Sequence, residues 1–430
     1  MANITPDPDK QYLTLAGRQI KKLVLQSEPI SKEMAIMNTN PPPLQDIVFT
    51  LFDRCPSWCD YCYNAKNVSG ALESRSFKNA PASLLTAEVF QLVEDGLPLG
   101  LRRIQLSGGE PLMKWHMVAD IATYCSERDV ATILYTNGYL ATDKVVRALA
   151  EAGLNKVRIS IGGPDYATHS EHRHDPGGPL AWRRILNAIE LFQSAGIVVE
   201  TLTPVTKKSI RYLQETARFV TSLGIKTIFF HNYIPSGIPA QDRGFQLDIK
   251  DHQRAVGLIL EIRKELTGRA TVIPNYGLFE FLSDRWEESD PVYKSPCGRT
   301  RIGVFPDGGI GTCCCTSLKL ANFRRAGFNL REFWLSNPTL KNIRNPKPPL
   351  PCALCKRWEV CLGACPSYSS PDPNKALAPT TCPIVMRFSK FKASSLSALE
   401  AVRSALGNKV RECEEPHKCT QILSMHGGLL

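Results

Sequence analysis

The sequence lacks any long apolar run. None of its stretches approaches the roughly 20 consecutive apolar residues that a membrane-spanning helix needs. Its N-terminal segment, MANITPDPDKQYLTLAG, has no basic start followed by an apolar stretch, so it does not resemble a secretory signal. No internal repeat is evident along the chain. These absences predict a cytoplasmic protein that does not associate with a membrane.

Blocks of Lys and Arg are also absent, although basic residues are in excess. The chain has 52 Lys and Arg against 41 Asp and Glu, which gives a formal net charge of +11. A basic face could attract an acidic peptide, a phosphate-bearing small molecule or RNA, or it could simply keep the protein in solution. The sequence shows no aromatic-basic pattern typical of an RNA-binding module, so we expect no nucleic acid partner.

The length and composition fit a globular protein. The chain has 430 residues, of which 43% are hydrophobic and 22% are charged. Both fractions are ordinary for a folded domain, and a chain of this length can bury a sizeable core. We therefore expect one large domain and a smaller one.

Short apolar runs alternate with longer amphipathic segments over residues 46–231. Strands are expected at 46–52, 101–107, 130–136, 156–161, 197–203 and 225–231. Helices are expected between them at 86–97, 116–128, 143–153, 180–196 and 213–224. The alternation predicts an α/β fold built from βαβ units, with a parallel sheet and right-handed crossovers. Functional groups then belong at the C-terminal ends of the strands.

Cysteine is abundant and mostly clustered. Of the 15 cysteines, only Cys125, Cys413 and Cys419 lie outside three clusters. The clusters comprise Cys55, Cys59 and Cys62; then Cys297, Cys313, Cys314 and Cys315; then Cys352, Cys355, Cys361, Cys365 and Cys382. In a reducing compartment such clusters indicate metal binding rather than disulfides. Cys125 is expected to be a buried, small apolar residue on a helix.

Four motifs follow consecutive expected strands. The three-cysteine motif in RCPSWCDYCYN follows the first strand, and SGGEP (107–111) follows the second. TNG (136–138) follows the third strand and SIGGP (160–164) the fourth. Because the C-terminal ends of parallel strands meet at one edge, the sequence predicts that all four motifs share one rim of the sheet.

The three-cysteine motif has the spacing C-x3-C-x2-C, one ligand short of a closed four-cysteine site. Thiolates favour zinc and iron–sulfur clusters, and a structural zinc ion requires four ligands. His116 or a histidine of HSEHRH (169–174) could supply a fourth ligand. The interpretation that we favour is an iron–sulfur cluster with one iron left open for a small molecule.

These motifs resemble those of the radical S-adenosylmethionine (SAM) superfamily, in which an aromatic residue precedes the third cysteine, as Tyr61 does here. The resemblance implies a partial (β/α)6 barrel over residues 46–245. It also implies a 4Fe–4S cluster held by three cysteines, with SAM chelating the fourth iron. One electron from the cluster would cleave SAM to a 5′-deoxyadenosyl radical, which removes hydrogen from a substrate.

The resemblance further implies a set of residues that contact SAM. They are Tyr61, Gly108, Gly109, Glu110, Asn137, Ser160 and Arg173. The two glycines and Glu110 would receive the methionine amino group, because glycine permits close backbone approach and a carboxylate suits an ammonium. Tyr61 would lie against the adenine, and Ser160 and Arg173 near the ribose and the carboxylate. Gly162 stands where the family usually has an aspartate.

The later cysteines resemble a SPASM domain. Cys352, Cys355, Cys361 and Cys365 have the spacing C-x2-C-x5-C-x3-C. The resemblance implies two auxiliary 4Fe–4S clusters, one on Cys297, Cys313 and Cys365 and the other on Cys352, Cys355, Cys361 and Cys382. Cys314 or Cys315 could complete the first set, or a substrate could use an open iron. A pair of zinc knuckles is the alternative.

Around the barrel, the expected boundaries are an N-terminal extension at 1–45, a helical connector at 246–290 and the SPASM domain at 291–385. A C-terminal helix and tail would occupy 386–430. The segment 291–385 is rich in cysteine, proline and glycine and shows little periodicity. We therefore expect it to bury little apolar surface and to depend on metal for its fold.

The expected function is that of a radical SAM peptide or protein maturase, which would oxidise, cross-link or epimerise its substrate. A flavodoxin- or ferredoxin-type reductant and a separate leader-binding protein would be partners, and Cys413 or Cys419 a candidate hydrogen donor. One alternative is a small-molecule enzyme acting on a haem or tetrapyrrole side chain, because HNYIPSG (231–237) weakly resembles such members. The other is a non-catalytic iron–sulfur electron carrier.

Overall fold

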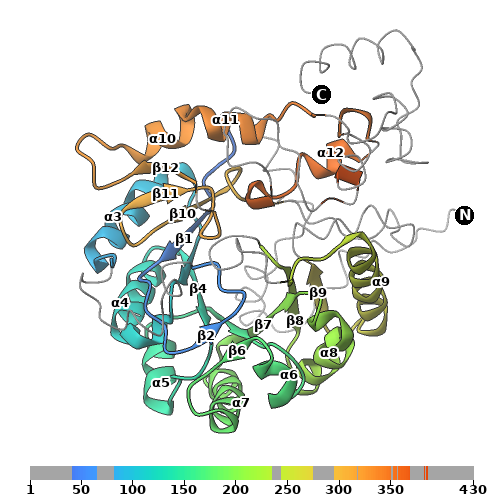
Figure 1. Ribbon diagram of the computed structural model, residues 1–430. Coiled ribbons are helices and arrows are strands. Elements are labelled where there is room, and N and C mark those ends of the chain that lie inside the picture. Colours follow the sequence, from blue (N-terminus) through green and yellow to red (C-terminus); the bar gives the residue numbers. More distant parts are fainter. Residues whose placement is uncertain are drawn as a thin grey trace, which may run out of the picture.

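The computed structural model describes residues 41–64, 82–234, 244–274, 295–316, 318–349, 352–355, 357–368, 382 and 384–385. Within these ranges, a ten-stranded sheet has the order β12-β11-β10-β1-β3-β4-β5-β7-β8-β9. Figure 1 shows the sheet curved into an open barrel, with helices along its outer side. The N-terminal extension up to residue 40 and the expected C-terminal helix and tail at 386–430, with Cys413 and Cys419, lie outside the described residues.

Six parallel strands form the centre of the barrel. They are β1 (Asp46–Thr50), β3 (Arg103–Ser107), β4 (Ala131–Thr136), β5 (Lys156–Ser160), β7 (Val198–Val205) and β8 (Thr227–Asn232). Each pairs in parallel with the next along the chain. The predicted strands and the parallel α/β sheet are thus confirmed.

Helices cover the outer side of these strands (Figure 1). They are α3 (Thr86–Gly96), α4 (Trp115–Ser126), α5 (Asp143–Glu151), α7 (Pro179–Ser194) and α8 (Leu213–Ser222). Helix α5 shows why they form: the Thr142 side chain accepts a hydrogen bond from the backbone N–H of Val145, and the apolar face of Val145, Val146 and Leu149 is buried. Cys125 is fully buried on α4, as predicted.

Smaller elements occupy the connections. They are β2 (Trp58–Cys59), β6 (Arg173–His174), α6 (Tyr166–Ser170), η3 (Leu97–Leu99), η4 (Pro111–Lys114) and η5 (Ser209–Tyr212). The sequence did not predict them, because elements of two to five residues are too short to show a period.

The barrel extends beyond the boundary that the sequence suggested. We expected a helical connector at 246–290, and α9 (Ile249–Glu265) is indeed a long helix. However, β9 (Thr271–Pro274) then pairs in parallel with β8, so this segment is a further helix–strand unit of the same sheet. A four-residue edge strand gives too weak a sequence pattern to be recognised.

The segment after residue 300 also joins the sheet. Strand β10 (Arg301–Val304) pairs in parallel with β1, and β11 (Gly309–Gly311) and β12 (Lys319–Asn322) follow as antiparallel strands. Helices α10 (Leu330–Ser336) and α11 (Pro338–Arg344) pack beside them. The remaining elements are η8 (Cys352–Leu354), α12 (Trp358–Cys361) and η9 (Pro366–Tyr368).

The expectation that 291–385 buries little apolar surface is wrong for its first half. Ile302, Val304, Ile310 and Trp334 are almost completely buried in the same core as the barrel helices. The indole N–H of Trp334 donates to the carbonyl of Pro42 at 2.9 Å. Short strands and seven-residue helices conceal this burial in the sequence, because neither is long enough for a periodic signal.

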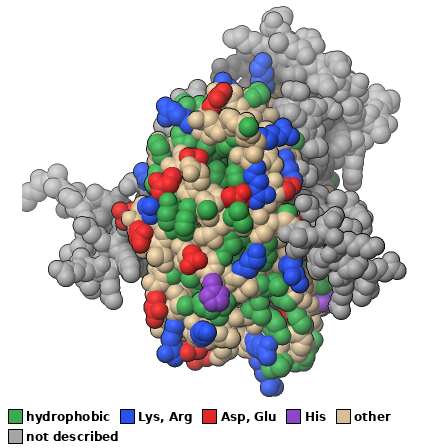
Figure 2. All heavy atoms as spheres, turned by 90° about the vertical axis from the view of Figure 1, so that its left-hand side faces the viewer, with side chains coloured by type: hydrophobic (Ala, Val, Ile, Leu, Met, Phe, Trp, Pro, Cys, Tyr) green, Lys and Arg blue, Asp and Glu red, His purple; other side chains and the backbone are tan. Residues whose placement is uncertain are grey.

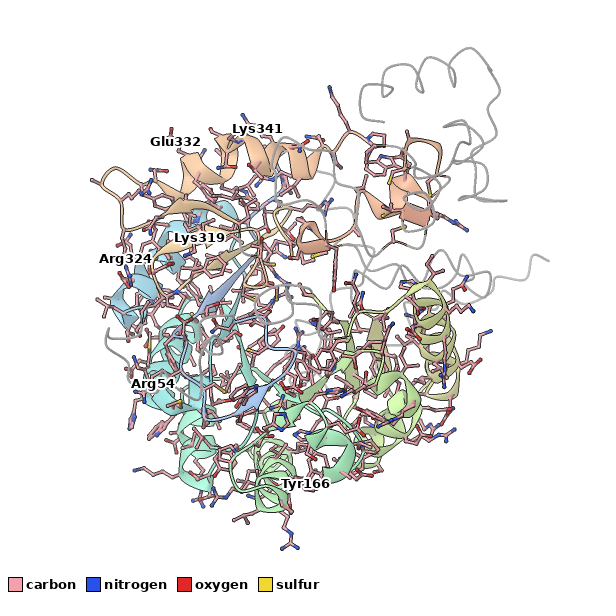
Figure 3. All side chains as sticks on the ribbon, in the orientation of Figure 1. Arg54, Tyr166, Lys319, Arg324, Glu332 and Lys341 are labelled. Carbon is pink, nitrogen blue, oxygen red and sulfur yellow. The ribbon has the colours of Figure 1, made fainter. Side chains whose placement is uncertain are left out.

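The outer surface mixes charges of both signs. Figure 2 shows Lys and Arg interspersed with Asp and Glu over the side that carries α3 and β12. Arg324, labelled beside α3 in Figure 3, pairs with Glu88 at 2.6 Å and so joins the end of β12 to α3. Among the described residues, no helix has both the length and the apolar character to cross a bilayer.

Candidate active site

The three-cysteine loop lies at the C-terminal end of β1. Within it, β2 pairs antiparallel with β6, which places Cys59 directly opposite Arg173. The Arg173 side chain is 4% exposed, and its Nη1 donates to the hydroxyl of Tyr61 at 3.4 Å. Arg173 therefore lies beside the cysteine loop and contacts Tyr61 within it; both residues were predicted to contact SAM.

Burial governs the acidity of the three thiols. It raises the pKa of Cys55 to about 12 and also raises the pKa values of Cys59 and Cys62. The positive charge of Arg173 opposes this effect at all three thiols. A metal that binds here must therefore displace protons, and Arg173 would help to stabilise the resulting thiolates.

The glycines of SGGEP let the cysteine loop approach the end of β3. A Cβ atom on Gly109 would lie 1.7 Å from the carbonyl oxygen of Arg54, and one on Gly108 2.6 Å from that of Phe52. The N–H of Gly109 donates to Phe52 at 2.7 Å, and that of Glu110 to Arg54 at 2.8 Å. The close approach that we predicted for these glycines is thus to the chain's own backbone, and their contact with SAM stays a prediction.

Glu110 joins the ends of two strands. Its carboxylate is 1% exposed and accepts from the N–H of Leu112 at 2.9 Å, the hydroxyl of Thr136 at 2.7 Å and the N–H of Asn137 at 2.7 Å. Burial raises its pKa, and these three donors oppose the rise. The side chain of Asn137 in turn donates to Ser57 at 2.9 Å and lies 4.0 Å from the sulfur of Cys55. Glu110 and Asn137 therefore position the cysteine loop.

Ser160 and Gly162 lie at the C-terminal end of β5, the fourth of the predicted strands. Ser160 is the last residue of β5. The N–H of Gly162 donates to Nδ1 of His169 at 3.1 Å, and a Cβ atom at this glycine would lie 3.0 Å from the carbonyl oxygen of His169. Gly162, which stands where the family usually has an aspartate, thus allows α6 to pack closely against this turn.

Three of the four histidines that could have supplied a fourth ligand have other partners, the exception being His172, whose ring nitrogens are buried without a hydrogen bond to any described residue. Nε2 of His169 lies 3.1 Å from Asp175, and His174 lies 3.3 Å from Asp60. The ring of His116 stacks on Trp115 at 3.5 Å. In the part of the chain that the structure describes, no three His, Cys, Asp or Glu side chains converge closely enough for a single metal ion.

The cysteines expected in the first auxiliary site come together. Cys297, Cys313 and Cys365 are buried in one cluster with Tyr368, and Cys315 packs against it. The hydroxyl of Tyr368 donates to the carbonyl of Asn232 at 3.1 Å, which ties this cluster to the end of β8.

Cys314 and Cys315 differ in their surroundings, although their sulfur atoms are 3.6 Å apart. Cys315 interacts with Cys313, whereas Cys314 interacts with the hydroxyl of Tyr63 and with the charge of Arg301. Tyr63 also lies 3.1 Å from the hydroxyl of Ser107 at the end of β3. The link from the cysteine loop through Tyr63 to Cys314 was not foreseen, since nothing in the motif spacing indicates it.

The cysteines expected in the second auxiliary site also gather. The thiol of Cys352 interacts electrostatically with those of Cys382, Cys361 and Cys355. Burial raises the pKa of Cys361 to about 11 and that of Cys382 to about 12. The two groups match the two ligand sets that the resemblance implies, while metal binding by them stays a prediction.

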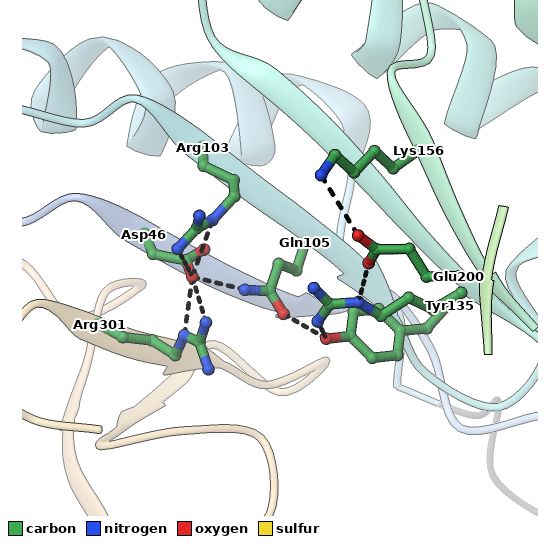
Figure 4. Close-up of polar contacts among 8 residues, drawn as sticks. Asp46, Arg103, Gln105, Tyr135, Lys156, Glu200 and Arg301 are labelled. Atoms are coloured by element: carbon green, nitrogen blue, oxygen red, sulfur yellow. Dashed lines mark hydrogen bonds and ion pairs between the residues drawn. The ribbon is translucent and has the colours of Figure 1, made fainter. Parts of the chain in front are cut away.

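The barrel lumen holds a charged network (Figure 4) that the sequence analysis missed. Asp46 accepts from Arg301 at 2.5 and 2.8 Å, from Arg103 at 3.1 and 3.3 Å, and from Gln105 at 2.5 Å. Only the alternation of residues along the strands could have indicated that these side chains share the inner face.

A second part of this network lies nearer the cysteine loop. Glu200 pairs with Arg158 at 2.6 Å and with Lys156 at 3.2 Å, and Arg158 also donates to the hydroxyl of Tyr135. Burial and the charges of Arg158 and Arg301 lower the pKa of His231 to about 3, so its imidazole is neutral. The described network has four basic side chains and two acidic ones, and the lumen is therefore basic.

Comparison with known proteins agrees with this geometry. The model of the radical SAM superfamily matches residues 49–220, which include the cysteine loop and the motif-bearing strand ends. Residues 49–220 therefore form a radical SAM domain. Proteins of this superfamily bind a 4Fe–4S cluster and SAM, so the predicted family, the barrel and these two cofactors are confirmed, while the auxiliary clusters stay a prediction.

The relatives of this radical SAM protein have different activities. It is 27% identical to the AdoMet-dependent heme synthase of Methanosarcina barkeri over 344 residues, covering 76% of this chain and 92% of that protein. It is 24% identical to the PqqA peptide cyclase of Methylocella silvestris, covering 73% and 80%. Native anSMEcpe, solved with AdoMet and the Cp18Cys peptide, shares the fold with a TM-score of 0.60 at 18% identity, covering 90% of this chain and 100% of that one.

Proposed function

We propose that Cys55, Cys59 and Cys62 hold the 4Fe–4S cluster of this radical SAM enzyme. When bound, the cluster supplies one electron and, through SAM, the means to remove a hydrogen atom from carbon. The donor set fits, because three soft thiols lie on one loop beside the buried guanidinium of Arg173. In a cluster each thiolate binds a different iron, so the thiols need not converge on one point.

The residues around the cysteine loop then bind and orient SAM. Tyr61 and Arg173 lie on the side of the loop that faces β6. Glu110 and Asn137 lie on the other side, where their hydrogen bonds hold the ends of β3 and β4. The carboxylate of Glu110 is near enough to raise the pKa of Cys55, which places its charge beside the cluster and within the region that the methionine ammonium would occupy.

We assign the remaining cysteine groups to two auxiliary clusters. Cys315 is the fourth ligand of the first cluster, because it packs against the buried group of Cys297, Cys313 and Cys365. Cys314 instead faces Tyr63. Cys352, Cys355, Cys361 and Cys382 hold the second cluster.

The substrate that the lumen favours bears carboxylates. Arg158 lies two residues before Ser160 on β5, so both side chains point inward and Arg158 is one step deeper. Its interactions with Glu200 and Tyr135 hold the guanidinium within a lumen that carries more positive than negative charge. Such a lumen attracts anions. Together with the heme synthase relatives, this supports a tetrapyrrole with carboxylate side chains as the substrate.

A peptide maturase is the second candidate, and it was the first expectation from the sequence. The similarity to PqqA peptide cyclases supports it, because these matches also cover about three quarters of the chain. An acidic side chain of a peptide would suit the same basic lumen. For either substrate, a flavodoxin- or ferredoxin-type protein would deliver the electron.

Substrate-dependent cleavage of SAM tests the proposal. The reconstituted enzyme is reduced anaerobically with an iron porphyrin that bears propionate side chains, with its methyl ester, or with an acidic peptide. We expect the free acid alone to increase 5′-deoxyadenosine formation and to change in mass. Arg158→Gln should reduce this increase at least tenfold, whereas Arg147→Gln, at an exposed arginine on α5, should not.

Equal turnover of the methyl ester would contradict a carboxylate-selective lumen. Modification of the peptide alone would replace the leading substrate by the second candidate.

A further inference from the structure

Arg299 connects the two auxiliary cysteine groups. It lies two residues after Cys297, and its side chain is 3% exposed. Nη1 donates to the carbonyl oxygens of Ser295 and Ala364, both at 3.2 Å, and Nη2 donates to that of Leu362 at 2.7 Å. Ser295 precedes the first group, and Leu362 and Ala364 lie between Cys361 and Cys365, so the guanidinium bridges both.

The charge of Arg299 has no carboxylate to balance it among the described residues. Its hydrogen-bond acceptors are three carbonyl oxygens, and its Nε is buried without a hydrogen bond. The ionisable groups that interact with it are the thiols of Cys361, Cys297 and Cys365, which come from both groups. An isolated buried cation is costly, so a negative charge at these thiols would stabilise the arrangement.

We propose that Arg299 is a shared counter-charge for the two auxiliary clusters and raises the reduction potential of both. The inference rests on the auxiliary clusters assigned under the proposed function. Adding one electron to a cluster makes it more negative by one charge, and a fixed cation nearby stabilises that reduced state. Arg299 is thus a positioning residue that keeps both clusters easier to reduce.

Arg344 provides a matched control. It is a partly buried arginine that also donates to carbonyl oxygens, those of Gly298 at 3.3 Å and Trp334 at 2.8 Å. Its guanidinium packs over the ring of Trp334 at 3.9 Å. Burial lowers its pKa to about 10, and no cysteine contributes to that shift. Its replacement removes a partly buried charge that does not act on the cysteine thiols.

The test is a redox titration followed by electron paramagnetic resonance on the full chain. The Cys55/Cys59/Cys62→Ala background removes the SAM-binding cluster, so the signals of the auxiliary clusters are measured alone. Iron content is determined first for this background and for Arg299→Gln, Arg299→Lys and Arg344→Gln within it. The Lys variant keeps the charge but loses the planar fork that holds three carbonyl groups.

We expect Arg299→Gln to lower both potentials, with at least a tenfold smaller reduced-to-oxidised ratio at a fixed potential, which corresponds to 59 mV for one electron. Arg299→Lys should return the potentials toward the background, and Arg344→Gln should leave them unchanged. If Arg299→Gln loses iron while Arg299→Lys retains both iron and potentials, the requirement for the charge is upheld.

Unchanged potentials in Arg299→Gln at full iron content would overturn the inference, as would an equal shift in Arg344→Gln. Loss of iron in both Arg299 variants would also overturn it, because the hydrogen bonds and not the charge would then be required. A background protein without auxiliary iron would instead refute the cluster assignment itself.

Discussion

Replacing Asp46 with asparagine should strongly destabilise the barrel. The side chain of Asp46 is 1% exposed and accepts hydrogen bonds from Arg301, Arg103 and Gln105 (Figure 4). Burial opposes its ionisation, but Arg301 and Arg103 outweigh this effect and lower its pKa. Asparagine keeps the shape but removes the charge, which leaves two guanidinium groups facing each other across β1.

The expected loss follows from the exposure of the two arginines. Removing one partner of a buried ion pair costs about 3–5 kcal/mol. The side chain of Arg301 is 14% exposed and that of Arg103 is 34% exposed, so solvent screens the second pair more than the first. We therefore expect a loss of about 3 kcal/mol. In a domain of about 150–250 residues, each kcal/mol lost lowers the melting temperature by about 2–4 °C. The melting temperature of Asp46→Asn should therefore fall by about 6–12 °C.

Thermal unfolding of Asp46→Asn and Asp143→Asn gives the measurement. Asp143 forms an exposed pair with Arg147 on α5, so its replacement should have no measurable effect. Because the folded-state pKa of Asp46 is lowered, its contribution is present above the unfolded pKa and is lost as the pH falls through the folded value. The difference between Asp46→Asn and wild type should thus be constant near neutral pH and shrink in acid. Equal melting temperatures for the two variants at neutral pH would refute the reasoning.

Two further pairs of substitutions test the site. Gly109→Ala should abolish iron binding at the cysteine loop, because the added Cβ would lie 1.7 Å from the Arg54 carbonyl oxygen, which would have to move by more than an ångström. Gly196→Ala strains a backbone with φ of +75° but meets no atom within 4 Å, so this control should retain all iron. Iron analysis checks both, and a full complement in Gly109→Ala would contradict the packing argument. Cys315→Ser should alter the Mössbauer spectrum of the first auxiliary cluster, whereas Cys314→Ser should leave it unchanged. The reverse result would make Cys314 the fourth ligand instead of Cys315.

The parallel barrel could be predicted because its strands and helices are long and regular. The helix at Pro179–Ser194 and the strand at Val198–Val205 each show the apolar pattern of their class, and Gly196 separates the two. The motifs could be placed on one rim because each directly follows a strand, and parallel strands end at the same edge.

Other features depend on contacts that a linear pattern does not carry. The pairing of β10 with β1 joins residues about 255 positions apart, as the ion pair of Asp46 with Arg301 shows. The sequence indicated that glycine is needed at Gly109, but not that the nearest atom belongs to Arg54. Cys314 and Cys315 are adjacent and chemically identical, so only their packing distinguishes them.

Iron and sulfide analysis after anaerobic reconstitution tests the central claim most directly. It is performed on the wild type and on the Cys55/Cys59/Cys62→Ala variant, together with SAM cleavage by each reduced protein. One open cluster and two auxiliary clusters predict about twelve irons, falling to about eight in the variant with complete loss of SAM cleavage. Zinc in the C-terminal cysteine groups, or SAM cleavage that survives in the variant, would contradict the account.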